Sequence, residues 1–129
     1  MSIERAQEAL QAAHLCLDSG LYASATSRAY YAMFWAAQAA LAHVGIGRSE
    51  WSHPALQASV VGELFRRRKH YPALLGQHLN RTLQLRLDAD YRLTGVSQQQ
   101  ATRAVHWTQG FVAMIQEEVS HGTDHPERC

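Results

Sequence analysis

Residues 25–37 read Ala-Thr-Ser-Arg-Ala-Tyr-Tyr-Ala-Met-Phe-Trp-Ala-Ala, and this stretch decides the fold. It lies within a longer run, free of glycine and proline, that continues from about residue 21 to residue 44. Apolar side chains recur in it at the three-to-four spacing of one helix face. The run therefore predicts a long helix with one buried face. That face consists of Tyr30, Met33, Phe34, Ala37 and Leu41.

A second face of this helix is aromatic and carries a charge. Arg28, Tyr31, Trp35 and Gln38 share that face, because they are three, four or seven residues apart. Tyr, Trp and Arg are enriched at protein interfaces. We therefore expect this helix to have two partners, the bundle core and a second protomer. The alternative is that Trp35 is a large core residue and Arg28 a surface charge.

Further helices are predicted on both sides of this run. Residues 3–17 repeat apolar side chains at helical spacing and precede Gly20, a residue typical of helix ends. Ser52 and Pro54 are typical of a helix start. That third helix is expected to stop before Pro72, because the residue preceding a proline disfavours helical geometry.

Two more helices complete the predicted bundle. Ser97 and Gln100 form a capping box that opens the last of them. No strand pattern of useful length and no internal repeat is present, so the predicted fold class is all-α, a compact bundle of about five helices. We expect one domain over residues 1–120 and a flexible tail at 121–129. The fourth helix has as core candidates Leu74, Leu75, Leu79, Leu83, Leu87 and Tyr91.

The composition is that of a globular protein. The chain has 129 residues, a formal charge of +1 and 47% hydrophobic residues, which argues against disorder and against a strongly basic or acidic tail. Two cysteines far apart in sequence do not make a disulfide framework. No window approaches eighteen apolar residues, and no secretory signal is visible. A cytoplasmic location without membrane contact is expected.

The stretch 25–37 resembles the helix typical of HEPN-domain proteins, specifically the small stand-alone kind of bacteria and archaea. The similarity continues through Ser52 and His53, through Leu-Asp-Ala-Asp-Tyr at 87–91 and to the end of the final helix. It implies an α-helical bundle that forms a homodimer and, in active members, a metal-independent ribonuclease. It also implies a partner, because many of these proteins are encoded beside a minimal nucleotidyltransferase as the toxin half of a toxin–antitoxin pair.

The family's catalytic motif is an arginine followed, after four to six residues, by a histidine, with the pairs of two protomers facing each other in a cleft. Arg28 matches the arginine, whereas Trp35 stands where close relatives place the histidine. An indole nitrogen only donates hydrogen bonds and cannot act as a general base. The resemblance therefore implies a HEPN subunit of a toxin–antitoxin-like or RNA-related defence module with weak or lost ribonuclease activity.

Two alternatives remain open at this point. The first is an active metal-independent endoribonuclease that uses Arg28 and His53, assisted by Tyr31. In that case a histidine would move a proton near neutral pH, and the arginine would stabilise charge on the phosphate. The second is a non-catalytic interaction or scaffold domain.

The middle of the chain is locally basic. Residues 48–86 hold seven basic and two acidic residues, a surplus that can attract an RNA backbone. The alternative is that the cations only complement the end of the third helix. With Tyr31 and Trp35, the candidates for binding RNA or a partner are Arg66, Arg67, Arg68 and Lys69.

Asp90 and Tyr91 belong to the segment that resembles the family. Buried arginines are rarely left unpaired, so we expect Asp90 to pair with Arg28 and to orient it. Asp90 and Tyr91 are then expected to be structural residues near the site.

Metal ligation is the weakest of the candidate chemistries. Glu50 with His53 and Glu118 with His121 have Glu-x-x-His spacing, but each pair lies at the end of an element. His125 belongs to the expected tail, where nothing rigid would hold a metal. We therefore predict neither a metal site nor a cofactor.

Overall fold

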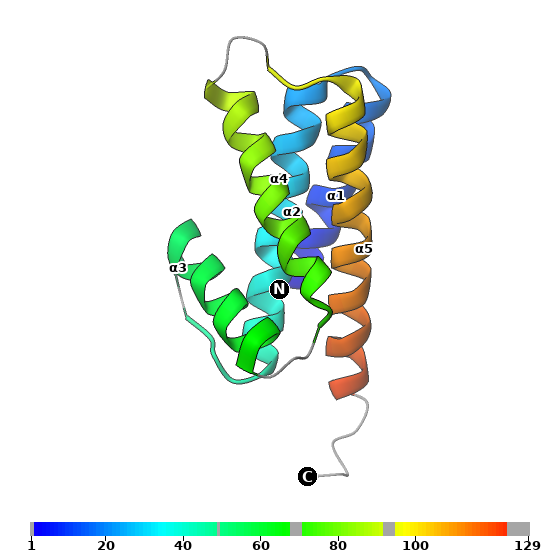
Figure 1. The fold of residues 1–129 in the computed structure, drawn as a ribbon. Coiled ribbons are helices and arrows are strands. Elements are labelled where there is room, and N and C mark those ends of the chain that lie inside the picture. Colours follow the sequence, from blue (N-terminus) through cyan, green and yellow to red (C-terminus); the bar gives the residue numbers. More distant parts are fainter. Residues whose placement is uncertain (1, 49, 68–70, 92–94, 124–129) are drawn as a thin grey trace.

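A computed structural model describes residues 2–48, 50–67, 71–91 and 95–123. Throughout these ranges every regular element is helical, which confirms the all-α prediction. Four long helices run side by side, and α3 lies beside α2 (Figure 1). The elements are α1 (Ser2–Asp18), α2 (Tyr22–His43), α3 (His53–Ser59), the π-helix η1 (Val60–Arg67), α4 (Ala73–Tyr91) and α5 (Gln98–Thr123).

The central helix of the bundle is α2, which packs against α1, α3, η1, α4 and α5. Its predicted buried face is confirmed. Tyr30, Met33, Ala37 and Leu41 are at most 1% exposed, and Phe34 is 7% exposed. Each large apolar side chain contributes roughly 1.5–3 kcal/mol when it is fully buried, so this face supplies much of the hydrophobic stabilisation.

Alanines bring α1, α2 and α5 close together. Ala13, Ala25, Ala29, Ala101 and Ala104 come from these three helices, form one cluster and are 0% exposed. Protein interiors are close-packed, so a larger side chain at such a position requires a helix to move. This alanine cluster fixes the spacing of the helices that carry the candidate site.

The connections follow the predicted signals. Gly20 joins α1 to α2 with a φ of 77°, a left-handed conformation that favours glycine. At the start of α3, the Ser52 hydroxyl accepts a hydrogen bond from the Ala55 amide at 3.2 Å. The capping box before α5 is also present, because the Gln100 amide donates to Ser97 Oγ at 3.1 Å and the Ser97 amide donates to Gln100 Oε1 at 3.0 Å.

The structure differs from the sequence prediction in the third and fourth helices. After Ser59 the chain continues as a π-helix, whose wider turns still bury Val60 and Leu64. In α4 the predicted core was too large: Leu74 is 54% and Tyr91 is 81% exposed. Only one face of α4 meets the bundle, and Leu75 and Leu79 occupy it. Leu87 is also exposed.

The last helix runs further than predicted. It extends to Thr123, three residues beyond the expected boundary at residue 120. Residues 124–129, which hold most of the predicted tail, lie outside the described residues. No helix within the described ranges is both long and apolar enough to cross a membrane.

Candidate functional site

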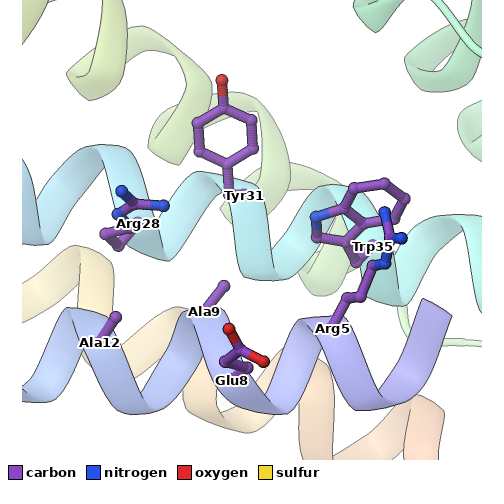
Figure 2. Close-up of a pocket in the computed structure, with 7 residues that line it drawn as sticks. All are labelled: Arg5, Glu8, Ala9, Ala12, Arg28, Tyr31 and Trp35. Carbon is purple, nitrogen blue, oxygen red and sulfur yellow. The ribbon is translucent and has the colours of Figure 1, made fainter. Parts of the chain in front are cut away.

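A groove of about 360 Å³ lies between α1 and α2. The second face of α2 forms one of its walls, as Figure 2 shows, with Arg28 and Trp35 toward opposite ends and Tyr31 between them. The structure thus brings together three residues that were placed on one helix face by their spacing. The other wall consists of residues from α1, namely Arg5, Glu8, Ala9 and Ala12.

Arg28 is exposed in this groove. Within the described part of the chain it makes no hydrogen bond or ion pair, so its guanidinium donors are available to a ligand. Planar guanidinium groups bind phosphate with two parallel hydrogen bonds. Arg5 adds a second cation and Glu8 a single carboxylate. The groove can therefore hold an anion at its Arg28 end.

Trp35, which by the family resemblance stands in place of a histidine, is held by two contacts. The Arg5 guanidinium lies over its indole ring at 4.8 Å from the centroid, and both side chains are visible together in Figure 2. The ring also meets Phe34 edge-on, with centroids 5.7 Å apart. A cation–π contact of this kind contributes about 0.5–1 kcal/mol at an exposed site. Trp35 is thus held in place, and it offers no proton acceptor.

A second cavity adjoins the groove at Trp35. Its volume is about 600 Å³, and Gln38, the fourth member of the predicted face, lines it with Trp51. Trp51 was missed by the sequence analysis, although Arg48 covers its ring at 4.3 Å. Its place in a loop between two helices left no periodic signal. The remaining lining residues are Phe34, Glu50 and Ser52.

His53 begins α3 and packs onto α2. Its Nδ1 atom lies 3.1 Å from the Tyr30 hydroxyl, and its ring lies 4.3 Å from that of Phe34. Burial, and then the charge of Arg86, lowers the pKa of His53 below its ordinary value of 6.5. Burial also raises the pKa of the Tyr30 phenol, which therefore keeps its proton. At neutral pH the pair is an uncharged hydrogen bond.

Arg86 is a second residue that the sequence analysis missed. Its guanidinium lies over the rings of Tyr30 and Tyr31, at 5.4 and 5.2 Å from their centroids. Its Nε atom is buried and lies 3.5 Å from Asp90 Oδ2. This contact is an ion pair but does not have the geometry of a hydrogen bond. We call the group of Tyr30, Tyr31, His53 and Arg86 the His53 cluster. It joins α2, α3 and α4.

Asp90 does not pair with Arg28, and this corrects the expectation from the sequence. Its carboxylate lies beside Arg86, four residues earlier on α4, and accepts a hydrogen bond from the Ser27 hydroxyl at 3.5 Å. The i, i+4 spacing of Arg86 and Asp90 was the signal that could have revealed this pair. Asp90 therefore orients Arg86. The side chain of Tyr91, the next residue, is 81% exposed.

The predicted catalytic pair, Arg28 and His53, is not joined by any hydrogen bond or ion pair of the described side chains. Tyr31 connects their surroundings, because it lines the groove and its ring lies 6.4 Å from that of His53. Of the predicted basic run, residues 68–69 and the side chains of residues 66–67 lie outside the described part. Their contribution to a site stays a prediction.

The pH dependence of stability tests the surroundings of His53. Because its folded pKa lies below 6.5, the unfolded chain binds more protons at this residue as the pH falls through that value. We expect the free energy of unfolding to decrease between about pH 7 and pH 5. Urea denaturation at several pH values should show a smaller decrease in His53→Gln. An equal slope in both proteins would contradict the partly buried, neutral state of His53.

The fold and the groove define a small all-α domain with an arginine-tyrosine-tryptophan face on its central helix. The model of the HEPN domain family matches residues 1–119. The chain therefore belongs to the HEPN domain family, as the resemblance of its second helix indicated.

Two relatives are similar over most of the chain. A protein of Methanocaldococcus jannaschii with the name "Putative toxin MJ0605" is 29% identical over 116 residues, which are 88% of this chain and 82% of the relative. The UPF0332 protein glr0978 of Gloeobacter violaceus is 33% identical over 89 residues, 69% of this chain and 68% of the relative. Both similarities extend well beyond a single helix.

Proposed function

We propose that this chain is the HEPN subunit of a toxin–antitoxin-like module, and that it binds RNA with weak or absent ribonuclease activity. Membership of the HEPN family and the name of the archaeal relative support the toxin-like or ribonuclease-like role. The observation that carries the finer proposal is the groove in which Arg28 pairs with no described residue while Trp35 is packed beneath Arg5.

The chemistry of this groove favours binding over cleavage. Arg28 can hold a phosphate, but Trp35 cannot take the proton from a 2′-hydroxyl. A general base typically contributes about 100-fold to 10,000-fold to a rate, so its absence would remove most of the activity. The proposal includes a homodimer that joins two such grooves and a nucleotidyltransferase as the antitoxin partner.

A metal-independent endoribonuclease that uses His53 is the second candidate. The His53 cluster supports it, because a neutral imidazole and the Arg86 guanidinium flank the same pair of tyrosines. This activity requires the tautomer in which Nδ1–H donates to the Tyr30 oxygen, since only then is Nε2 free to accept a proton. Arg28 would have to reach the same phosphate from the groove side of Tyr31.

RNA cleavage in the presence of a chelator separates the two candidates. We expect wild type to bind single-stranded RNA, to lose affinity in Arg28→Gln, and to cleave the RNA little or not at all. Robust cleavage that His53→Ala and Arg86→Gln abolish, and that His43→Ala leaves intact, would overturn the proposal in favour of the second candidate. Light scattering at the assay concentration reports the oligomeric state, and a monomer would remove the shared cleft.

A further inference from the structure

A cavity of about 230 Å³ lies between α4 and α5, in the half of these helices nearest to their connection. The two helices run side by side in Figure 1. None of the residues that line this cavity belongs to the α1–α2 groove or to the His53 cluster. They are Arg81, Gln84, Leu85, Gln100, Arg103 and Trp107.

The α4–α5 cavity is positively charged. Arg81 and Arg103 are exposed, and neither makes an ion pair or a hydrogen bond with any described residue. None of the described lining residues is acidic. Burial, followed by the charges of Arg81 and His106, lowers the pKa of the neighbouring His78. Two guanidinium groups without a described partner, in a lining that holds no carboxylate, favour an anionic ligand.

An aromatic ring lies beside these charges. Trp107 lines the cavity, and the ring of His78 stacks on it with centroids 4.9 Å apart and an angle of 14° between the planes. The stack holds the indole in one orientation. Aromatic side chains in basic surroundings are the usual stacking surfaces for unpaired bases.

The cavity also offers neutral polar groups. Gln84 and Gln100 carry amides that can both donate and accept hydrogen bonds. The Gln100 carbonyl oxygen accepts from the Ser97 amide, so its amide nitrogen remains to donate. The edges of bases combine donors and acceptors in the same way. A volume of about 230 Å³ is below the roughly 300–1,000 Å³ of sites for drug-sized ligands, which suits a single base.

We propose that the α4–α5 cavity is a second RNA-binding site, which takes one unpaired nucleotide with its base against Trp107 and its phosphates at Arg81 and Arg103. This inference rests on the proposed RNA-related function. It extends that function, because the site lies on helices that form no part of the groove at Arg28. RNA held here would be a strand that also passes over other surfaces of the protein or its dimer.

A matched pair of charge variants tests the site. Gln84→Glu adds a carboxylate inside the cavity, and Gln116→Glu adds the same charge to an exposed residue of α5, nine residues beyond Trp107 and outside the lining. With a short fluorescent single-stranded RNA as the probe, we expect Gln84→Glu to weaken binding about fivefold or more and Gln116→Glu to change it much less. Arg103→Gln should reduce the slope of log affinity against log salt by about 0.7.

The fluorescence of Trp107 gives a local readout. RNA should quench wild-type emission, and Trp107→Phe should lose the part of that quenching that comes from the cavity. Equal binding by the two glutamate variants, together with unchanged quenching in Trp107→Phe, would overturn this inference while leaving RNA binding at Arg28 intact. Absence of RNA binding by wild type at low salt would overturn the proposed function as well. Competition by an acidic peptide but not by RNA would assign the cavity to a protein partner and overturn the inference.

Discussion

Trp35→His is expected to convert the protein into an active metal-independent ribonuclease. The substitution places an imidazole in the groove that holds Arg28 and Tyr31. A histidine there can accept the 2′-hydroxyl proton near neutral pH, and Arg28 can stabilise the charge that develops on phosphate. We expect cleavage of single-stranded RNA in chelator to increase about 100-fold to 10,000-fold over wild type.

Two further variants identify the source of that gain. Trp35→Phe removes the indole without adding a base, so its cleavage should stay at the wild-type level. The double variant Trp35→His with Arg28→Ala should lose most of the new activity, because the phosphate is no longer held. If Trp35→His folds, dimerises and still does not cleave RNA, position 35 is not the place of the catalytic base.

Ala29→Leu is expected to cause the largest loss of stability. Ala29 is 0% exposed within the alanine cluster, and its carbonyl oxygen accepts a hydrogen bond from the buried Thr108 hydroxyl at 3.3 Å. A leucine side chain must push α2 away from its neighbours and strain this bond. Overpacking of this kind costs about 1–3 kcal/mol and occasionally more. Urea denaturation followed by circular dichroism measures the loss.

Ala23→Leu provides the matched control for this substitution. Ala23 lies on the same helix but is exposed, so the same change adds no buried volume there. Its free energy of unfolding should stay within about 0.5 kcal/mol of wild type. Equal stability of Ala29→Leu and Ala23→Leu would show that the alanine cluster can expand without cost, contrary to the close packing described above.

Much of the fold could be predicted from local patterns. The apolar face of α2, the serine cap before α3 and the capping box before α5 are all confirmed, because each depends on residues within a few positions of one another. The π-helix after Ser59 left no such pattern. The exposure of Leu74 was missed for a related reason, since helical spacing does not say which adjacent residue faces the core.

The site could be predicted only in part. Spacing placed Arg28, Tyr31 and Trp35 on one face, and the structure gathers them in one groove. Spacing did not reveal that Tyr31 lies between His53 of α3 and Arg86 of α4, because these contacts join separate helices. Contacts of this kind depend on the packing of the whole bundle. The stack of His78 on Trp107 likewise joins two helices, so spacing along the sequence did not reveal it.

From the position of Tyr31 we expect ligand binding in the groove and proton uptake at His53 to be thermodynamically linked. Its ring is part of the groove, and the same ring touches Arg86 and lies near His53. A ligand that moves Tyr31 changes the electrostatic surroundings of His53 and therefore its affinity for a proton. By reciprocity, protonation of His53 changes the affinity of the groove for that ligand by the same factor. Through this one tyrosine, a change in the groove is expected to be felt in the His53 cluster, and the reverse.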